Sequence, residues 1–311
     1  MLKNTVKKTE DISTKVREKS RKRARRWGTT WTSWITDREQ EVDIKHFSSF
    51  STWFNPNCFS VIISEEKRGK HRLGLWIYEE TSREEKIDEK DIHFIKMFTV
   101  FSIGEAKRKS DLIEKKLLGE DEVYKNHPIL ALLEWGDKSI YFSDIVKKAR
   151  VAKSNALTNS DVYIKEHDVI GIRINNTTTY HIAVYLGNNQ VAHIRGLANV
   201  PSEQWKAQQD SISEFLKSRE SDEVILNRLI IPFKKPELIR EHIRKAIAAK
   251  YGEGKYNVVS NNCEHFATLC VTGVKFSSQV ENPFNFNFRL DKEKIKEETL
   301  SNNNFIAQIQ V

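Results

Sequence analysis

The chain is 311 residues long, 39% hydrophobic and 30% charged, which is typical of a soluble globular protein with one or two domains. No apolar run reaches the roughly 18 to 20 residues of a transmembrane helix, and the basic N-terminus lacks the apolar stretch of a signal peptide. The three cysteines, Cys58, Cys263 and Cys270, have neither metal-site spacing nor the even count of a disulfide framework. We therefore expect a cytoplasmic protein that needs no metal and no other cofactor.

The net charge of +8 resides in the N-terminal segment, because residues 1–26 carry eleven Lys or Arg against three acidic residues. Three tryptophans follow this basic stretch at the spacing of one helix face: Trp27, Trp31 and Trp34. We predict that residues 1–40 form a flexible basic tail, with some of its aromatic side chains packed on the folded body.

The basic tail leaves three functional interpretations open. It is a solvated arm without a partner, or a peripheral membrane element in which residues 15–35 bind an anionic lipid surface. Alternatively, residues 15–26 act as a nuclear-import signal or bind nucleic acid. Nothing else in the sequence supports a nucleic-acid partner, so the first two interpretations are favoured.

Residues 41–155 are predicted to fold as an α+β region without visible chemistry. Apolar runs at 58–63 and 73–78 indicate two strands joined by a charged turn. A further apolar run at 94–103 leads into a charged helical stretch that ends near residue 118. Three histidines of this region stand alone in the sequence, and we expect no catalytic role for them: His71, His93 and His127.

Residues 156–280 are predicted to form a separate domain that opens with a three-stranded antiparallel meander. Apolar, β-branched runs separated by Asn-rich turns indicate its strands at residues 168–174, 181–186 and 190–194. A further strand is expected at 224–231, followed by a helix from Pro236 in which isoleucines recur at i, i+4 and i+8. The domain is thus expected to combine a small sheet with helices.

Two histidines lie at the ends of the predicted hairpin. His181 opens its first strand and His193 closes its second. Because antiparallel pairing brings the start of one strand beside the end of the other, the two imidazoles are expected at one edge of the sheet. The alternative is that one is a hydrogen-bonded core residue and the other lies on the surface.

Cys263 is the most informative residue of the chain. It occupies the predicted first turn of a helix that runs from the N-cap Asn262 to the stop signal Gly273. Unpaired backbone N–H groups and the positive end of the helix dipole favour a thiolate there, which predicts a lowered thiol pKa. A cysteine nucleophile also needs a base, and the two upstream histidines are candidates.

Several segments together resemble the lecithin-retinol acyltransferase (LRAT) domain family, whose members include the small phospholipase/acyltransferases. They are Asp168-Val169-Ile170, the strands that carry His181 and His193, and the motif Asn262-Cys263-Glu264-His265-Phe266. The resemblance covers about residues 160–275. It implies an α+β domain with a circularly permuted papain-like (NlpC-like) fold, in which a small antiparallel sheet packs with helices and the histidines precede the cysteine.

The resemblance also implies the roles of the site residues. Cys263 is the nucleophile that forms an acyl-thioester, His181 is its general base and later its acid, and His193 orients His181. Backbone N–H groups at the start of the helix, supported by Tyr180 and Asn262, would form an oxyanion hole. Two further side chains of the helix are assigned no chemistry: His265 and Cys270.

Three functions stay open on these residues. The first is a thiol acyltransferase or phospholipase acting on a phospholipid or another acyl ester. The second is a papain-like amidase or peptidase with the same site, and the third is a binding or signalling module without turnover. Relatives that act on membrane lipids commonly end in a hydrophobic anchor, whereas residues 281–311 form a polar tail. Either the basic tail replaces that anchor or the substrate is soluble.

Overall fold

The computed structural model describes two compact units, Met1–Glu120 and Asp121–Val311. The described residues are 43–50, 52, 58–65, 70–78, 92–119, 121–133, 140–141, 145–175, 177–195, 204–217, 221–257, 261–277, 289–290 and 295–297. The predicted basic tail and most of the polar C-terminal tail lie outside them, so membrane or nucleic-acid binding through the basic tail stays a prediction. Within the described ranges, no helix is both long and apolar enough to span a bilayer.

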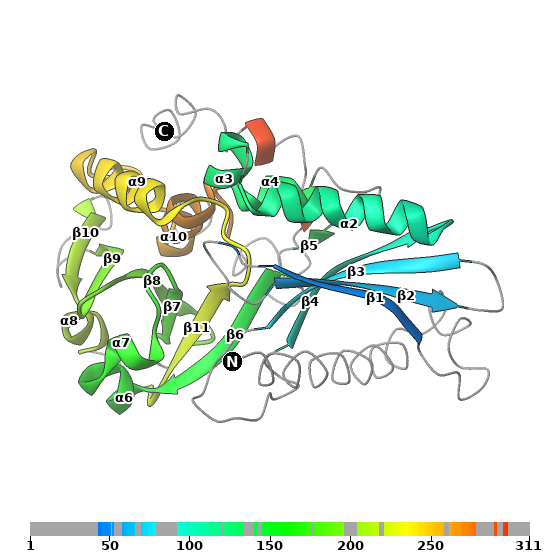
Figure 1. Cartoon of the computed structure of the whole chain (residues 1–311). Coiled ribbons are helices and arrows are strands. Elements are labelled where there is room, and N and C mark those ends of the chain that lie inside the picture. The colour runs from blue at the N-terminus through cyan, green and yellow to red at the C-terminus, as the bar shows by residue number, and fades with distance from the viewer. Residues whose placement is uncertain are drawn as a thin grey trace. The chain divides into compact units, whose positions relative to one another are not determined.

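The first unit contains a four-stranded antiparallel sheet in the order β1-β2-β3-β4, labelled in Figure 1. Its elements are β1 (Asp43–Phe50), β2 (Cys58–Glu65), β3 (Lys70–Tyr78), β4 (Ile92–Val100) and the helix α2 (Ile103–Leu117). Helix α2 begins where the Ser102 hydroxyl accepts a hydrogen bond from the Glu105 N–H group, and it packs against β2 and β3. The predicted hairpin and charged helix are confirmed, whereas the sequence analysis missed β1.

The second unit is built on a six-stranded antiparallel sheet in the order β10-β9-β8-β7-β11-β6. Its strands are β6 (Val146–Ala152), β7 (Val169–Arg173), β8 (Tyr180–Gly187), β9 (Gln190–Arg195), β10 (Lys206–Ser211) and β11 (Glu223–Leu229). The predicted meander forms its centre as β7-β8-β9, and the predicted strand at 224–231 is β11. Strand β6 precedes residue 156 and pairs with β11, so the sheet extends beyond the predicted domain of residues 156–280.

Helices complete the second unit and confirm the α+β class. They are α3 (Glu122–Asn126), α4 (Pro128–Leu133), α6 (Lys153–Thr158), α7 (Ser160–Tyr163), α8 (Ile212–Leu216), α9 (Pro236–Ala248) and α10 (Cys263–Thr272). Two short strands, β5 (Ile140–Tyr141) and β12 (Arg289–Leu290), pair with each other. Pro236 opens α9, and the predicted isoleucine face is found there, with Ile239 and Ile243 buried and Ile247 partly buried.

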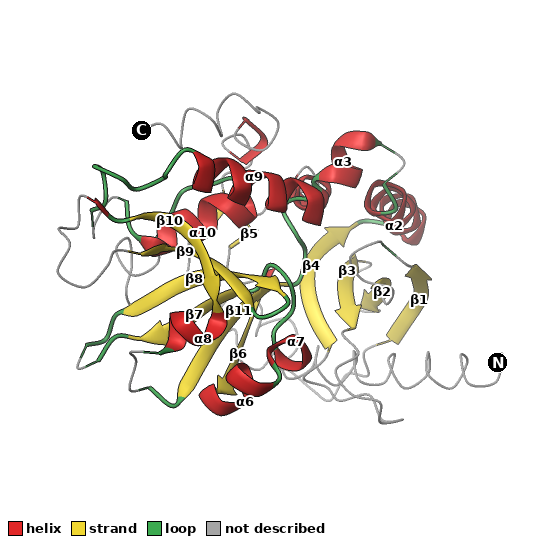
Figure 2. Ribbon diagram, turned by 90° about the vertical axis from the view of Figure 1, so that its left-hand side faces the viewer, coloured by secondary structure: helices red, strands yellow, loops and turns green. Residues whose placement is uncertain are grey.

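Strand β8 serves two hydrophobic cores because its side chains alternate between the faces of the sheet. On one face, Ile182 and Val184 pack with residues of α9 and α10. On the other face, Ala183 and Tyr185 pack with residues of α6 and α8. Figure 2 shows α9 and α10 on one side of the strands and α6 and α8 on the other. The six-stranded sheet is therefore the middle layer that positions α10.

Gly171 lets β7 lie closely between its neighbours β8 and β11. A Cβ atom at this position of β7 would meet Ile182 Cδ1 at 2.7 Å and Ile225 Cγ1 at 2.9 Å. Real Cβ contacts are almost never that short, so an added methyl group must displace β8 or β11 side chains. The glycine therefore fixes how tightly the centre of the sheet packs.

Replacing Gly171 with alanine is expected to destabilise the second unit by about 1–3 kcal/mol, because overpacking forces side chains and backbone to shift. Chemical denaturation followed by circular dichroism measures the change in the free energy of unfolding. Gly104→Ala is the control, since a Cβ at Gly104 meets no atom closer than 3.9 Å. Equal stability of the two variants would contradict the close packing at Gly171.

Candidate active site

Strands β8 and β9 form a tight hairpin that brings the two predicted histidines together. Its turn residues Asn188 and Asn189 are both left-handed, with φ of 52° and 59°, a conformation that asparagine tolerates and that two-residue hairpin turns require. Across the hairpin, His181 Nε2 lies 2.9 Å from His193 Nδ1. The prediction that the two imidazoles are neighbours is confirmed.

The histidine pair is packed against an aromatic ring from helix α8. The Phe215 ring is stacked on His181, with centroids 5.2 Å apart and an interplanar angle of 29°. It also meets His193 edge-on, at 5.3 Å and 88°. Phe215 is itself buried in the core on this side of the sheet. The two imidazoles are therefore held by packing as well as by their mutual hydrogen bond.

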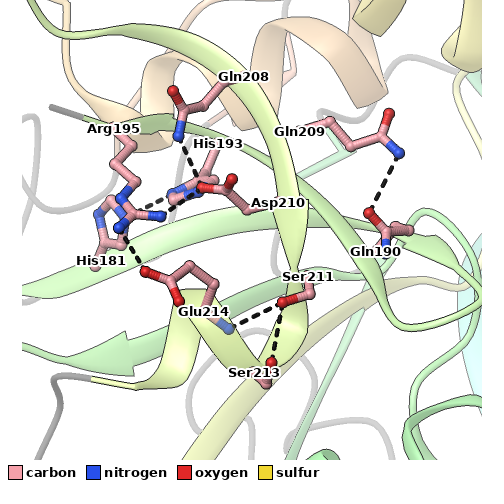
Figure 3. A network of polar contacts seen from close by, with 10 residues as sticks. All are labelled: His181, Gln190, His193, Arg195, Gln208, Gln209, Asp210, Ser211, Ser213 and Glu214. Atoms are coloured by element: carbon pink, nitrogen blue, oxygen red, sulfur yellow. Dashed lines mark hydrogen bonds and ion pairs between the residues drawn. The ribbon is translucent and has the colours of Figure 1, made fainter. Parts of the chain in front are cut away.

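Strand β10 adds a carboxylate that the sequence analysis did not identify. Asp210 Oδ2 lies 2.9 Å from His193 Nε2, so it contacts the nitrogen that does not face His181. The same oxygen accepts hydrogen bonds from Arg195 Nη1 at 2.9 Å and from Gln208 Nε2 at 2.7 Å. Arg195 also donates to Glu214 Oε1 at 2.6 Å. Figure 3 shows these side chains converging from β9, β10 and α8.

Asp210 is an ionised carboxylate at neutral pH. The hydrogen bond from His193 lowers the pKa of Asp210 far below its usual range, burial opposes this effect, and the bonds from Arg195 and Gln208 reinforce it. The carboxylate thus carries a negative charge beside an imidazole whose side chain is only 2% exposed. The contact is a charge-assisted hydrogen bond between a buried imidazole and a carboxylate whose side chain is 19% exposed.

The cysteine motif forms a capped helix, as predicted. The Asn262 side chain accepts hydrogen bonds from the N–H groups of Glu264 and His265, and His265 Nδ1 accepts the Asn262 N–H at 3.2 Å. This reciprocal arrangement is a capping box with histidine in the place usually taken by Glu or Gln. Gly273 ends α10 in a left-handed conformation, φ 83°, with its N–H bonded to the Leu269 carbonyl.

The Cys263 thiol lies against the backbone on both sides of His181. Its Sγ atom is 3.9 Å from the Tyr180 carbonyl oxygen, and it also accepts a hydrogen bond from the Ile182 N–H group. The helix start and the first residues of β8 are therefore in direct contact. The structure brings the predicted nucleophile to the backbone of the two residues that flank its predicted base.

The Cys263 thiol can reach the backbone of Tyr180 and Ile182 because β8 and β9 are not paired at the end of the hairpin away from its turn. The backbone groups of Thr179 and Tyr185 bond on the β7 side of the strand, so those of Tyr180 and Ile182 point toward β9. In the described register, pairing of β8 with β9 extends only from Gly187 back to Val184. Beyond that point the thiol occupies the β9-facing edge of β8.

The pKa of the Cys263 thiol differs from the predicted direction. Burial raises this pKa to about 11, while the N–H groups of Ile182 and of the helix start lower it and the nearby charge of Glu264 raises it further. The expected lowering by the helix N-terminus is real but smaller than the cost of desolvating the thiolate. Cys263 is therefore a protonated thiol at neutral pH, and a thiolate there would require a base to accept the proton.

The structure also places the other residues that the sequence analysis named around Cys263. His265 serves the helix cap, and burial lowers its pKa to about 4, so it is a neutral structural residue as predicted. Cys270 is completely buried in the core, and burial raises its pKa well above the usual range. Tyr180 meets the thiol through its backbone carbonyl, and the Asn262 side chain caps α10. A direct oxyanion contact of either side chain stays a prediction.

Comparison with known proteins supports the resemblance found in the sequence. Residues 163–276, which contain β7 through α10, match the family model described as lecithin retinol acyltransferase. The LRAT resemblance is confirmed for this segment. We refer to it below as the LRAT-like segment.

Curated relatives match a segment of the chain at low identity. Lecithin retinol acyltransferases of Mus musculus and Rattus norvegicus are each 26% identical over 132 residues, which cover 35% of this chain and 56% of the relative. The Bos taurus enzyme of the same name is 25% identical over an equally long segment. The chain thus spans about half the length of the curated relatives it matches.

The cap of α10 is expected to stabilise the LRAT-like segment measurably. Asn262→Ala removes the acceptor for two backbone N–H groups and should lower the free energy of unfolding by about 1–2 kcal/mol. Asn262→Ser is the control, because serine is also an effective N-cap. Denaturant titrations of both variants test this, and an alanine variant as stable as wild type would contradict the capping role.

The raised thiol pKa predicts how Cys263 reacts once its candidate base is removed. In His181→Gln, burial should keep the thiol protonated, so alkylation by iodoacetamide should rise about tenfold per pH unit up to pH 10. An unperturbed thiol would level off near its pKa of about 8.5. Mass spectrometry with fragmentation between Cys263 and the buried Cys270 gives the site-specific rate. A plateau below pH 9 would show that burial does not control the thiol.

Proposed function

We propose that the chain is a thiol-dependent acyltransferase or phospholipase that forms an acyl-thioester on Cys263. His181 is its general base, and the acyl donor is a phospholipid or another ester. The observation that carries this proposal is the contact of the Cys263 thiol with the backbone on both sides of His181, whose ring is bonded to His193. The match of this segment to an acyltransferase family supports the reaction class.

The proposed first step couples two proton movements to acyl transfer. His181 removes the proton from the Cys263 thiol as sulfur attacks the ester carbonyl, since the raised pKa of the thiol disfavours a preformed thiolate. The tetrahedral adduct collapses when the C–O bond to the leaving alcohol breaks. The His181 imidazolium then donates its proton to that alcohol, and the acyl group stays on sulfur as a thioester.

The second step returns the site to its starting state. An alcohol, an amine or water enters, and neutral His181 removes its proton as it attacks the thioester carbonyl. Cleavage of the C–S bond releases the product, and the imidazolium reprotonates the thiolate. Water as acceptor gives a phospholipase, whereas an alcohol or amine gives a transferase. The protein residues required are the same in each case.

Helix α10 supplies the proposed oxyanion stabilisation. The Cys263 N–H group at the helix start is the proposed donor to the negative oxygen of the adduct, because the N–H groups of Glu264 and His265 already donate to Asn262. Asn262 acts here by placing the helix, since its side-chain oxygen already accepts two hydrogen bonds. A helix that carries the cysteine and packs on an antiparallel sheet with the histidines also supports the proposed permuted papain-like arrangement.

A fluorescent phospholipid tests the proposed reaction on the full chain. We expect Cys263-dependent release of lysolipid and an acyl adduct on Cys263 that hydroxylamine removes. Cys263→Ala should abolish both, and His181→Ala should slow adduct formation by about 10²- to 10⁴-fold. Cys270→Ala is the matched control, because this second cysteine of α10 is buried in the core. Absence of an adduct and of lysolipid would refute the acyl-ester reaction, and cleavage of amide substrates at Cys263 would instead support the amidase alternative.

A further inference from the structure

Three side chains form a continuous hydrogen-bonded chain that ends at His181, the residue whose neighbours in β8 contact the Cys263 thiol through their backbone. Asp210 Oδ2 contacts His193 Nε2 at 2.9 Å, and His193 Nδ1 contacts His181 Nε2 at 2.9 Å. The members come from three adjacent strands, β10, β9 and β8. The LRAT resemblance assigns roles to the two histidines, and Asp210 has no assigned role.

The charge of Asp210 determines which protons the imidazoles carry. A carboxylate can only accept a hydrogen bond, so His193 Nε2 must be protonated. In neutral His193, Nδ1 is then an acceptor, and the proton shared with His181 must reside on His181 Nε2. The lone pair of neutral His181 is consequently on Nδ1. That is the nitrogen that does not face His193.

This protonation pattern is the one that thiol activation requires. A base must present an unprotonated nitrogen to the S–H group, and Nε2 of His181 is engaged with His193. The opposite tautomers would place a proton on Nδ1 and abolish base function without any change in ring position. Tautomer control is therefore separate from the control of geometry that Phe215 provides by stacking on His181.

The surroundings of Asp210 hold its oxygen in place. Three donors converge on Oδ2, from His193, Arg195 and Gln208. Arg195 forms ion pairs with both Asp210 and Glu214, so its single positive charge does not fully neutralise Asp210. Lys217 lies 3.6 Å from the other oxygen of Glu214, but its side chain is 75% exposed and its charge is screened by solvent.

We propose that Asp210 is a positioning residue of the thiol site, which fixes the Nε2–H tautomers of His193 and His181 and stabilises the imidazolium that forms on His181. The inference rests on the proposed function for the identity of the reacting thiol. It adds a carboxylate to the cysteine and two histidines that the LRAT resemblance implies. Asp210 acts through His193 and does not touch the substrate.

Two substitutions distinguish the effect of the Asp210 hydrogen-bond acceptor from the effect of its negative charge. Asp210→Ala removes the acceptor, so His193 should lose its preference for the Nε2–H form. Asp210→Asn keeps an oxygen toward the three converging donors but removes the negative charge. The tautomers should then persist while the imidazolium is less stable. Gln209→Ala is the matched control, because Gln209 lies next to Asp210 on β10 and its side chain donates to Gln190, outside the chain of histidines.

Tautomers are read directly by long-range ¹H–¹⁵N correlation spectra of the ¹⁵N-labelled full chain. His181→Gln and His193→Gln spectra assign the two rings. We expect Nε2–H forms for both rings in the wild type, in Asp210→Asn and in Gln209→Ala, and a mixture in Asp210→Ala. An Nδ1–H form of His193 in the wild type, or spectra unaffected by Asp210→Ala, would overturn the inference.

The pH dependence of Cys263 alkylation by iodoacetamide supplies a second readout that needs no acyl substrate. We expect Asp210→Asn to slow alkylation at neutral pH at least about tenfold. The pH below which the rate falls, because His181 becomes protonated, should also be lower, since the imidazolium is less stable without the carboxylate charge. If Asp210→Asn had the wild-type alkylation rate and pH dependence, the proposed role of the negative charge would be contradicted. If Asp210→Ala does not fold, Asp210→Asn still decides the question.

These readouts keep the inference distinguishable from the proposed function. Loss of Nε2–H tautomers in Asp210→Ala, in a protein that forms no acyl adduct, would refute the acyl-ester reaction and leave the positioning role intact. An acyl adduct on Cys263 that forms at the wild-type rate in Asp210→Asn and Asp210→Ala would refute the positioning role alone.

Discussion

The candidate site depends on the opening of the β8–β9 hairpin at the end that carries His181. Near the Asn188-Asn189 turn the two strands pair, but the described pairing stops at Val184. The backbone groups of Tyr180 and Ile182 still point toward β9, and there the Cys263 thiol contacts them. Continued pairing would occupy the Ile182 N–H group and exclude the sulfur. The hairpin therefore has to be tight at its turn and open at its site end.

Alternation along β8 explains how one strand serves both the core and the site. Its even-numbered side chains pack with α10, so the helix that carries the thiol is fixed to one face of the sheet. The His181 ring is stacked on Phe215, which belongs to the core on the other face. The imidazole and the thiol thus approach the same short stretch of backbone from different sides. Small shifts of β8, such as those an added methyl at Gly171 would cause, act on both partners together.

Much of this arrangement is visible in the sequence because its signals are local. The Asn-Asn turn, the strand that carries His181 and the capped helix at Asn262 each follow from residues close together in the chain. Strand β10 was missed because its sequence, KAQQDS, contains a single apolar residue, Ala207, and thus no apolar alternation. It is a strand because β9 offers an edge to pair with, and Asp210 therefore became identifiable only in the folded chain.

The direction of the Cys263 pKa could not be predicted for a related reason. Helix-end effects are local and favour the thiolate, but the degree of burial is set by β8 and the surrounding core. In the fold, desolvation is the larger effect, as expected for a charge that would form in a nearly water-free position. The prediction of a lowered pKa was wrong because it weighed only the contribution visible in the motif.

A buried protonated thiol and a histidine pair linked to a carboxylate would together lower the cost of forming charges in the interior. In the proposed mechanism, proton transfer from Cys263 to His181 would create a thiolate and an imidazolium together, so no net charge would enter the interior. The helix start and the Ile182 N–H group stabilise the negative partner, and the chain through His193 to Asp210 stabilises the positive one. The thiolate alone is disfavoured, because burial raises the pKa of the Cys263 thiol. In the proposed reaction, the thiol would therefore become a thiolate only as the base removes its proton, in step with attack on an acyl group.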